Sequence, residues 1–148
     1  MSRTVDLDWT RYPSFTPGEF RCRGIGCCSG LIIVHPGFLE RLQLARNEFG
    51  KSMHVLSGCR CKVHNEKPAA LGGAGGHPRS LHVCDAPMHP GQEGTIAVDI
   101  AAVDGTYRGE LFTLLWKHGF SVGWNAKRSF LHGDMRVWLG MKQTSFDY

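Results

Sequence analysis

One acidic residue lies in the middle of an apolar run whose alternation is typical of a β-strand. In residues 95–101, the side chains of Ala97, Asp99 and Ala101 would share one face. A carboxylate in such surroundings loses its hydration unless it is paired or bound to a metal ion. The two small neighbours leave room above the strand. Asp99 is therefore interpreted either as a metal ligand or as an acid that faces water at the end of the strand.

A second polar group lies in a strand predicted for residues 130–137. Alternation places His132, Asp134 and Arg136 on one face of that strand. A histidine and an acid two positions apart can both reach one water molecule on a metal ion. The same pattern is typical of the exposed face of an edge strand, and both interpretations stay open at this point.

Three further candidates belong to a long glycine-rich stretch and the end of the strand before it. Ser80 and His82 lie in this stretch, and histidine is the commonest metal ligand. His77 and His89 compete with His82 for the same role. Arg60 ends the strand that precedes the stretch, and its planar guanidinium suits a carboxylate or an oxyanion. The alternatives are solvent-exposed histidines and a surface salt bridge.

The cysteines form a separate group. Six cysteines in 148 residues are far below the density of a disulfide-rich miniprotein. Five of them lie on two segments, and they predict a structural zinc or a disulfide that pins the N-terminal loop to the strand end at Arg60. Unlinked buried thiols are the alternative, since the spacings are not the C-x2-C knuckles of strong zinc modules. The five are Cys22, Cys27, Cys28, Cys59 and Cys61, and the sixth is Cys84.

These residues need a scaffold, and the sequence predicts a small α+β domain. Apolar residues recur at helical spacing in residues 36–49 and 106–118. The last two predicted strands are joined by a short polar turn, which favours a mainly antiparallel sheet flanked by helices. Residues 1–30 are expected to form loops, and residues 61–95 a long surface excursion. The predicted strands are 53–57, 95–101, 120–124 and 130–137.

Composition excludes several classes of protein. With 42% hydrophobic and 20% charged residues, the chain can bury a core and is neither disordered nor fibrous. No apolar run approaches the roughly 20 residues that span a bilayer, so no membrane insertion is expected. The first residues carry acids where an export signal would be apolar. The net charge of +4 suits an anionic partner, but Lys and Arg are dispersed, so nucleic acid is not expected.

Several motifs, taken in order, resemble the D-Ala-D-Ala carboxypeptidase-like zinc peptidases, and the compact single-domain branch found in phage lysins in particular. The resemblance covers about residues 15–138 and implies one hedgehog/DD-peptidase-like zinc peptidase domain in residues 1–148. It implies that His82, Asp99 and His132 hold one zinc ion, and that Arg60 and Ser80 contact substrate. The motifs are Ser57-Gly-Cys-Arg60, His64-Asn65, Gly72-Gly73, Ser80-x-His82, Ala97-Val-Asp99-Ile, Gly119-Phe and Phe130-Leu-His132-Gly-Asp134, with Phe15-x-Pro17-x-Glu19-Phe20-x-Cys22 before them.

The sequence departs from the family pattern in two ways. Asp99 lies seventeen positions after His82, because an insertion at about residues 83–93 separates them. The insertion contains His89, which competes with His82 as the first zinc ligand. Many relatives also place a glutamate three positions before the last histidine as general base, and Ser129 occupies that position. Asp134 is then the candidate for proton transfer or for support of a ligand.

The expected function is hydrolysis of peptide bonds in peptidoglycan stem peptides or cross-links by a D,D-carboxypeptidase- or endopeptidase-like zinc enzyme. Without an export signal, the protein is expected to be a phage endolysin released from the host cytoplasm through holin-type lesions, or a virion-associated lysin. The alternative is a non-catalytic, zinc-stabilised wall-binding or virion-structural module. Zinc content and wall lysis distinguish these two classes.

Overall fold

The helix predicted at 36–49 is α2 (Pro36–Phe49) in a computed structural model of the chain, which describes residues 7–148. Proline at the first helical position needs no hydrogen bond from its nitrogen. The side chain of His35 accepts a hydrogen bond from the Gly37 N–H, and Gly50, with φ of 68°, ends the helix in the left-handed conformation. Its buried face is largely the predicted stripe, with Phe38, Leu39, Leu42 and Ala45 fully buried.

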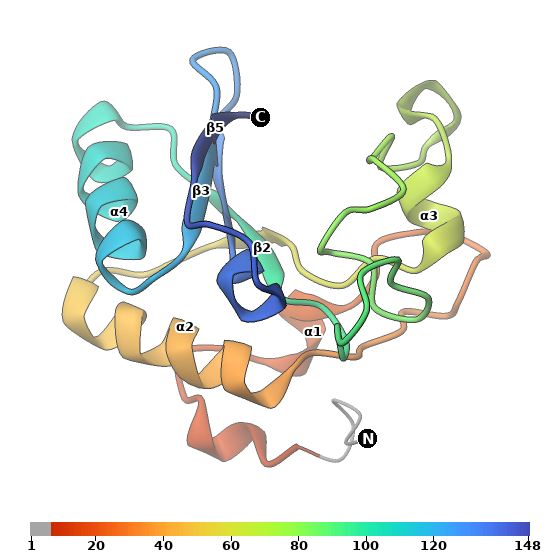
Figure 1. The fold of residues 1–148 in the computed structure, drawn as a ribbon, viewed down its shortest axis with the longest axis horizontal. Helices are drawn as coiled ribbons and strands as arrows, with labels where there is room; N and C mark the ends of the chain where they lie inside the picture. Colours follow the sequence, from red (N-terminus) through yellow and green to blue (C-terminus); the bar gives the residue numbers. More distant parts are fainter. Residues whose placement is uncertain (1–6) are drawn as a thin grey trace.

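The second predicted helix is α4 (Gly105–Lys117), one residue earlier than expected at each end. Asp104 caps it by accepting a hydrogen bond from the Tyr107 N–H at 2.9 Å. Leu111 and Leu115 are fully buried. Helices α2 and α4 contact each other, and together they cover one face of the sheet (Figure 1).

The sheet has five strands within residues 7–148, in the order β1-β2-β4-β3-β5. Neighbouring strands are antiparallel except β3 and β5, which are parallel. The predicted α+β class and the mainly antiparallel sheet are therefore confirmed. The strands are β1 (Val55–Ser57), β2 (Ala97–Ala101), β3 (Ser121–Trp124), β4 (Phe130–Asp134) and β5 (Ser145–Asp147).

The end of the sheet differs from the prediction in two ways. β4 ends at Asp134 rather than at residue 137, because the Asp134 carboxylate accepts a hydrogen bond from the Arg136 N–H at 3.0 Å and turns the chain into a 3-10 helix, η4 (Arg136–Leu139). β5 was not predicted. It has only three residues, too few for a period-2 pattern to stand out, and it adds to the sheet edge by pairing with β3.

The N-terminal segment is more ordered than the predicted loop. It contains a 3-10 helix, η2 (Trp9–Arg11), and a short helix, α1 (Pro17–Phe20). The Thr16 N–H donates to the Glu19 carboxylate at 2.7 Å, and Phe20 is fully buried beneath β1. Residues 1–6, which carry part of the acidic start, lie outside the described residues.

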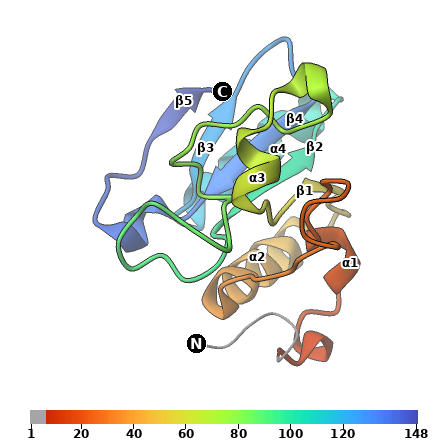
Figure 2. The ribbon, with the colours of Figure 1, turned by 90° about the vertical axis from the view of Figure 1, so that its right-hand side faces the viewer.

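The excursion between β1 and β2 crosses the other face of the sheet (Figure 2). It contains a short helix, α3 (Lys62–Glu66), and a 3-10 helix, η3 (Ala69–Leu71), and its remainder is irregular. One face of the sheet is thus closed by helices, and the other faces this excursion. No helix in residues 7–148 is long and apolar enough to cross a membrane.

Candidate metal centre

The strand register brings two of the predicted ligands together. Asp99 on β2 is the direct antiparallel partner of His132 on β4, so their side chains share one face of the sheet. His82 comes from the excursion, where its carbonyl accepts a hydrogen bond from the Arg60 N–H at 2.9 Å. This hydrogen bond holds His82 beside the end of β1 and within reach of Asp99 and His132.

The three donor atoms are spaced as the ligands of one small cation. His82 Nε2 lies 3.2 Å from Asp99 Oδ1 and 3.3 Å from His132 Nδ1, and His132 Nδ1 lies 3.0 Å from Asp99 Oδ1. Tetrahedral zinc with nitrogen and oxygen ligands at 2.0–2.1 Å places neighbouring donors about 3.3 Å apart. Two histidines and one carboxylate that leave a fourth position open are typical of catalytic zinc. The residues therefore fit zinc.

Hydrogen bonds on the far side of each ring assign the tautomers. His82 Nδ1 lies 2.7 Å from the Gly58 carbonyl, and His132 Nε2 lies 2.7 Å from Asp134 Oδ2. Each of these nitrogens donates its hydrogen to an oxygen. The lone pairs of His82 Nε2 and His132 Nδ1 are thereby left facing Asp99. The imidazoles are oriented for metal binding by the protein itself.

Asp134 lies behind His132 and not beside an open position of the site. It is 1% exposed, and its two oxygens lie 2.9 Å and 2.7 Å from Arg136 Nε and Nη2. Burial opposes its ionisation, but the hydrogen bonds from Arg136 and His132 lower the pKa of Asp134 to about 2. Of the two roles open to Asp134, this geometry favours the support of a ligand over proton transfer.

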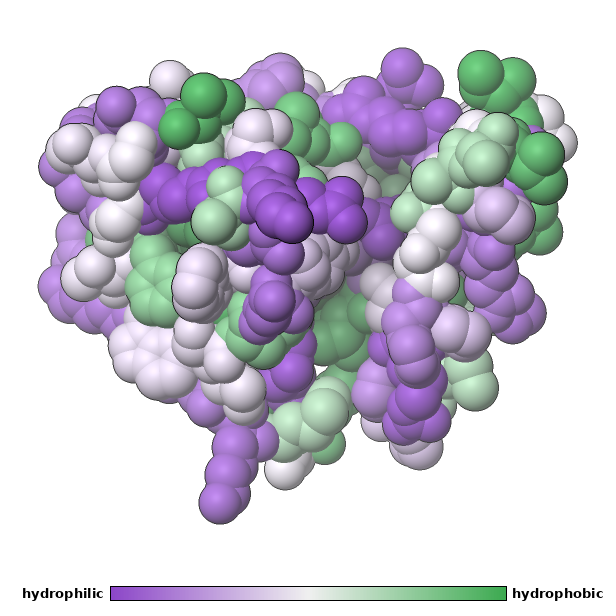
Figure 3. All heavy atoms as spheres, turned by 90° about the horizontal axis from the view of Figure 1, so that it is seen from above, coloured by the Kyte–Doolittle hydropathy of each residue, from purple (hydrophilic) through white to green (hydrophobic). Residues whose placement is uncertain are grey.

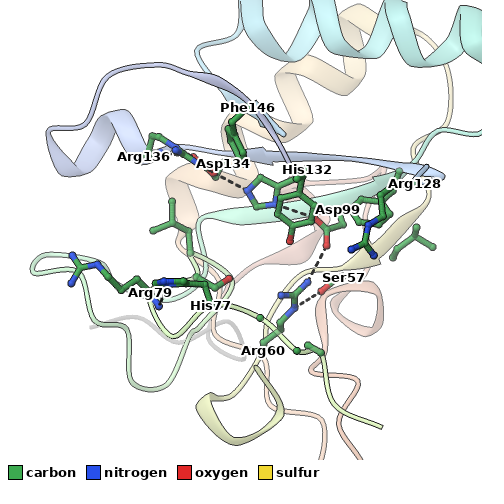
Figure 4. Close-up of a pocket in the computed structure, with 18 of the residues that line it drawn as sticks. Ser57, Arg60, His77, Arg79, Asp99, Arg128, His132, Asp134, Arg136 and Phe146 are labelled. Carbon is green, nitrogen blue, oxygen red and sulfur yellow. Dashed lines mark hydrogen bonds and ion pairs between the residues drawn. The ribbon is translucent and has the colours of Figure 1, made fainter. Parts of the chain in front are cut away.

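Arg60 is buried and contacts the ligand carboxylate directly. Its Nη2 donates to Asp99 Oδ2 at 3.0 Å, and its Nε donates to Ser57 Oγ at 3.1 Å. Asn65 Oδ1 lies 3.4 Å from Nη1. Figure 4 shows the guanidinium between Asp99 and Ser57 at the wall of the pocket. Arg60 thus fixes the second oxygen of Asp99 and places a positive charge next to the donor atoms.

The electrostatics of the trio favour an ionised Asp99 and a neutral His82. Burial opposes ionisation of Asp99, but the charges and hydrogen bonds of His82 and His132 hold its pKa well below its usual range. Burial and the Arg60 charge lower the pKa of His82. For His132, burial acts in the same direction, but the hydrogen bond to Asp134 and the negative charges of Asp99 and Asp134 outweigh it and raise the pKa, which favours the protonated ring. An ionised Asp99 beside a neutral His82 is ready to bind a cation.

The site opens into a pocket of about 680 Å³. Seen from above, hydrophilic atoms gather along the hollow between the sheet and the excursion (Figure 3). Both acids of the lining, Asp99 and Asp134, are already paired with arginine. The pocket is therefore cationic, and its arginines come from five separate parts of the chain: Arg23, Arg60, Arg79, Arg128 and Arg136.

The competing histidines lie elsewhere on the pocket lining. His89 Nε2 lies 2.9 Å from the carbonyl of Arg79, and its Nδ1 lies 3.3 Å from Arg79 Nη2. His77 Nδ1 accepts a hydrogen bond from the Arg79 N–H at 3.1 Å. Only His82 joins Asp99 and His132, among the histidines that competed for this position. Ser80 lines the pocket, and its hydroxyl oxygen accepts a hydrogen bond from the His82 N–H at 3.3 Å.

Two aromatic residues at the site were not predicted. The ring of Tyr148 stacks on His132, with centroids 4.6 Å apart and an interplanar angle of 15°. The Arg136 guanidinium lies 4.4 Å from the centre of the Phe146 ring. Both aromatics reach the site because β5 pairs with β3. In the sequence, only the alternation of Phe146 and Tyr148 indicates a strand that could carry both aromatic rings on one face.

Four of the five cysteines considered together do gather. The sulfurs of Cys22, Cys27, Cys28 and Cys61 lie within 4.8 Å of one another. Cys59 does not join them, because the register of the strand end turns it into the core, where its Sγ donates to the Ile33 carbonyl at 3.4 Å. The six cysteines are all free thiols in the structure.

Comparisons of the chain with protein-family models, with curated proteins and with solved structures find no match. The interpretation of the site therefore rests on the spacing of three donor atoms, on the hydrogen bonds behind them and on the charge of the pocket. The sequence resemblance agrees with that geometry on the same three residues, His82, Asp99 and His132.

Proposed function

We propose that the chain is a zinc peptidase that hydrolyses peptide bonds in peptidoglycan stem peptides or their cross-links, in a hedgehog/DD-peptidase-like domain. The observation that carries the proposal is the convergence of His82 Nε2, Asp99 Oδ1 and His132 Nδ1 at the wall of a cationic pocket. A structural zinc would have four protein ligands, whereas this donor set has three and faces a cavity.

Zinc held by these residues would polarise a peptide carbonyl and activate water for attack on it. The surrounding side chains have their own tasks. Asp134 holds His132 in its ligand tautomer, and Arg60 holds Asp99. The Arg60 charge, next to Asp99 at the pocket wall, would also stabilise negative charge that develops on a carbonyl oxygen there, which is the electrostatic stabilisation that acyl transfer needs. The Ser80 hydroxyl is placed on the pocket lining to donate to a substrate oxygen.

The charge of the pocket supports this substrate class. Stem peptides carry free carboxylates from their acidic residues and from their carboxyl ends. Arginine binds a carboxylate with two parallel hydrogen bonds, which adds geometric selectivity to charge attraction. Arg79 and Arg128 lie on different walls of the pocket and form no ion pair with a carboxylate in residues 7–148, so their charges could engage such groups.

The biological setting is part of the same proposal. An endolysin that waits in the host cytoplasm for holin-type lesions, or a virion-associated lysin, meets peptidoglycan with a catalytic domain of this kind. The net charge of +4 favours adsorption to an anionic wall. Zymography, in which a lysate of cells that produce the protein is run in a gel containing peptidoglycan, would detect its lytic activity.

Digestion of purified peptidoglycan tests the proposal. Zinc-loaded protein should release new amino and carboxyl ends, and mass spectrometry of the fragments identifies the bond that is cut. H132A should be inactive, whereas H89A, which removes a histidine of the same pocket outside the trio, should remain active. Uncut peptidoglycan with zinc bound at the trio would contradict the proposal. Adsorption without cleavage would support the wall-binding module instead.

A further inference from the structure

The four gathered cysteines form a group that the proposed peptidase chemistry does not use. Cys22, Cys27 and Cys28 belong to the loop that follows α1, and Cys61 immediately precedes α3. Their sulfurs lie within 4.8 Å of one another, and the Sγ atoms of Cys27 and Cys28 are 3.7 Å apart. Cys22 and Cys61 are buried, and the other two are half-buried.

These distances fit a metal better than a disulfide. Four thiolates at about 2.3 Å from zinc form a tetrahedron whose edges are about 3.8 Å long. A disulfide brings two sulfurs to about 2.05 Å, and no two of these cysteines are bonded in the structure. The separation of 3.7 Å between Cys27 and Cys28 is close to the tetrahedral edge.

Backbone N–H groups point at the sulfurs, as they do around thiolate ligands. The Cys61 N–H donates to Cys22 Sγ and the His64 N–H to Cys61 Sγ, each at 3.4 Å. Gly24 makes the loop possible, because a Cβ at that position would lie 2.4 Å from Cys27 Sγ and 2.9 Å from the His64 side chain. The backbone is therefore folded closely around the four sulfurs.

Basic residues flank two of these cysteines in the sequence, and such a site is anionic. Zinc with four thiolates carries a net charge of −2, since each thiol releases its proton to solvent on binding. Arg21 and Arg23 flank Cys22 in the sequence, and Arg60 and Lys62 flank Cys61. Neighbouring cations stabilise thiolate over thiol. The two segments that carry the buried ligands are thus basic in sequence.

We propose that Cys22, Cys27, Cys28 and Cys61 bind a structural zinc ion as a closed tetrathiolate. This inference goes beyond the proposed peptidase function and does not depend on it. The zinc would link the loop after α1 to the segment in which the chain leaves β1. That segment contains Arg60, and Cys61 caps the helix whose Asn65 contacts Arg60. The tetrathiolate would therefore also fix one wall of the pocket.

Metal analysis in an H132A background tests the proposal, because that background removes a ligand of the other site. Protein purified under reducing conditions should retain one zinc per chain. X-ray absorption at the zinc edge should show four sulfur neighbours at about 2.3 Å. Cobalt substitution should produce the sulfur-to-cobalt charge-transfer bands of a tetrathiolate. H132A with C28S should lose the zinc and these bands, whereas H132A with C84A, a thiol outside the cluster, should retain both.

The measurements on H132A itself need no cysteine variant, so misfolding of C28S would not obscure the result. Zinc absent from H132A, or zinc bound by nitrogen and oxygen alone, would overturn the proposal. A thiol count on the denatured, unreduced protein that finds a disulfide among the four cysteines would overturn it as well. If the C28S and C84A variants lost zinc and the charge-transfer bands equally, neither would come from this cluster, and the proposal would be overturned.

Discussion

The two clusters of potential ligands are built on different parts of the fold. Asp99 and His132 lie on adjacent strands of the sheet, and His82 is hydrogen-bonded to the end of β1. Three of the four cysteines lie instead on a loop between α1 and α2, with few buried apolar side chains of its own. The sheet can hold its ligands in place before a metal binds, whereas the loop has little besides the sulfurs to hold it.

The difference predicts different consequences of metal loss. Side chains and a carbonyl hold the first cluster from behind, through Asp134, Arg60 and Gly58. Removing its metal should therefore abolish chemistry and leave the fold. The tetrathiolate has no open position, so its metal should contribute to folding free energy.

The largest effect is expected for H132A. Loss of a zinc ligand removes several kcal/mol of transition-state stabilisation, which corresponds to about 10³-fold or more in kcat/KM. Zinc at the trio should be lost, while the melting temperature should fall by only a few degrees, measured by calorimetry. The matched control is H89A. If H89A empties the site and H82A does not, the first ligand is wrongly placed.

The second prediction concerns removal of the cysteine zinc in the otherwise intact chain. A metal present at about 10³ times its Kd contributes about 4 kcal/mol, which for a domain of this size corresponds to about 10 °C in Tm. C28S should show this loss in calorimetry. C84A serves as the control, because it removes a buried thiol that is not a member of the cluster and should therefore retain the metal. Equal melting temperatures for the wild-type protein and C28S would remove the distinction between the clusters.

The third prediction separates the two roles of Asp134. D134N should weaken zinc affinity by about 10–100-fold, the usual effect of losing a hydrogen-bonded support behind a ligand. Activity should return when zinc is supplied in excess. If Asp134 instead transferred protons, kcat would stay about 10²–10⁴-fold low at saturating zinc. Competition with a chromophoric chelator gives the affinity, and kcat is then measured at saturation.

A smaller effect is expected for R60K. Lysine retains the charge but cannot contact Asp99, Ser57 and Asn65 together. Loss of one charge-assisted hydrogen bond corresponds to about 10-fold in kcat/KM. Zinc content at both sites should remain that of the wild-type protein. An unchanged rate would show that Arg60 does not contribute to turnover.

The smallest effect is expected for R23Q. Arg23 lies in the cysteine loop and lines the pocket, so it connects the two regions. It is exposed, and an exposed charge contributes at most about 1 kcal/mol, so KM for an anionic peptide should rise by about 2–5-fold. The rise should disappear at high salt. A change in kcat instead of KM would mean that the loop acts on the reacting groups.

The sequence pattern within single segments was enough to predict the bounds of one helix and the strand faces that carry two of the ligands. The helical stripe predicted α2 to its terminal residues, because Pro36 and Gly50 mark both ends. Period-2 alternation placed Asp99 and His132 each on the correct face of its strand. These are short-range consequences of backbone geometry, so one sequence suffices to derive them.

Tertiary structure decided which of the candidates meet. Nothing local distinguishes His82 from His89. Hydrogen bonds to distant segments, such as those of the His82 carbonyl with the Arg60 N–H and of the His82 ring with the Gly58 carbonyl, bring His82 to Asp99. Likewise, Cys59 and Cys61 lie two residues apart, yet one enters the core and the other joins the cysteine cluster. β5 and Tyr148 reach His132 through pairing with β3. Such contacts depend on strand register and loop closure between distant segments, and the sequence pattern of any single segment does not contain them.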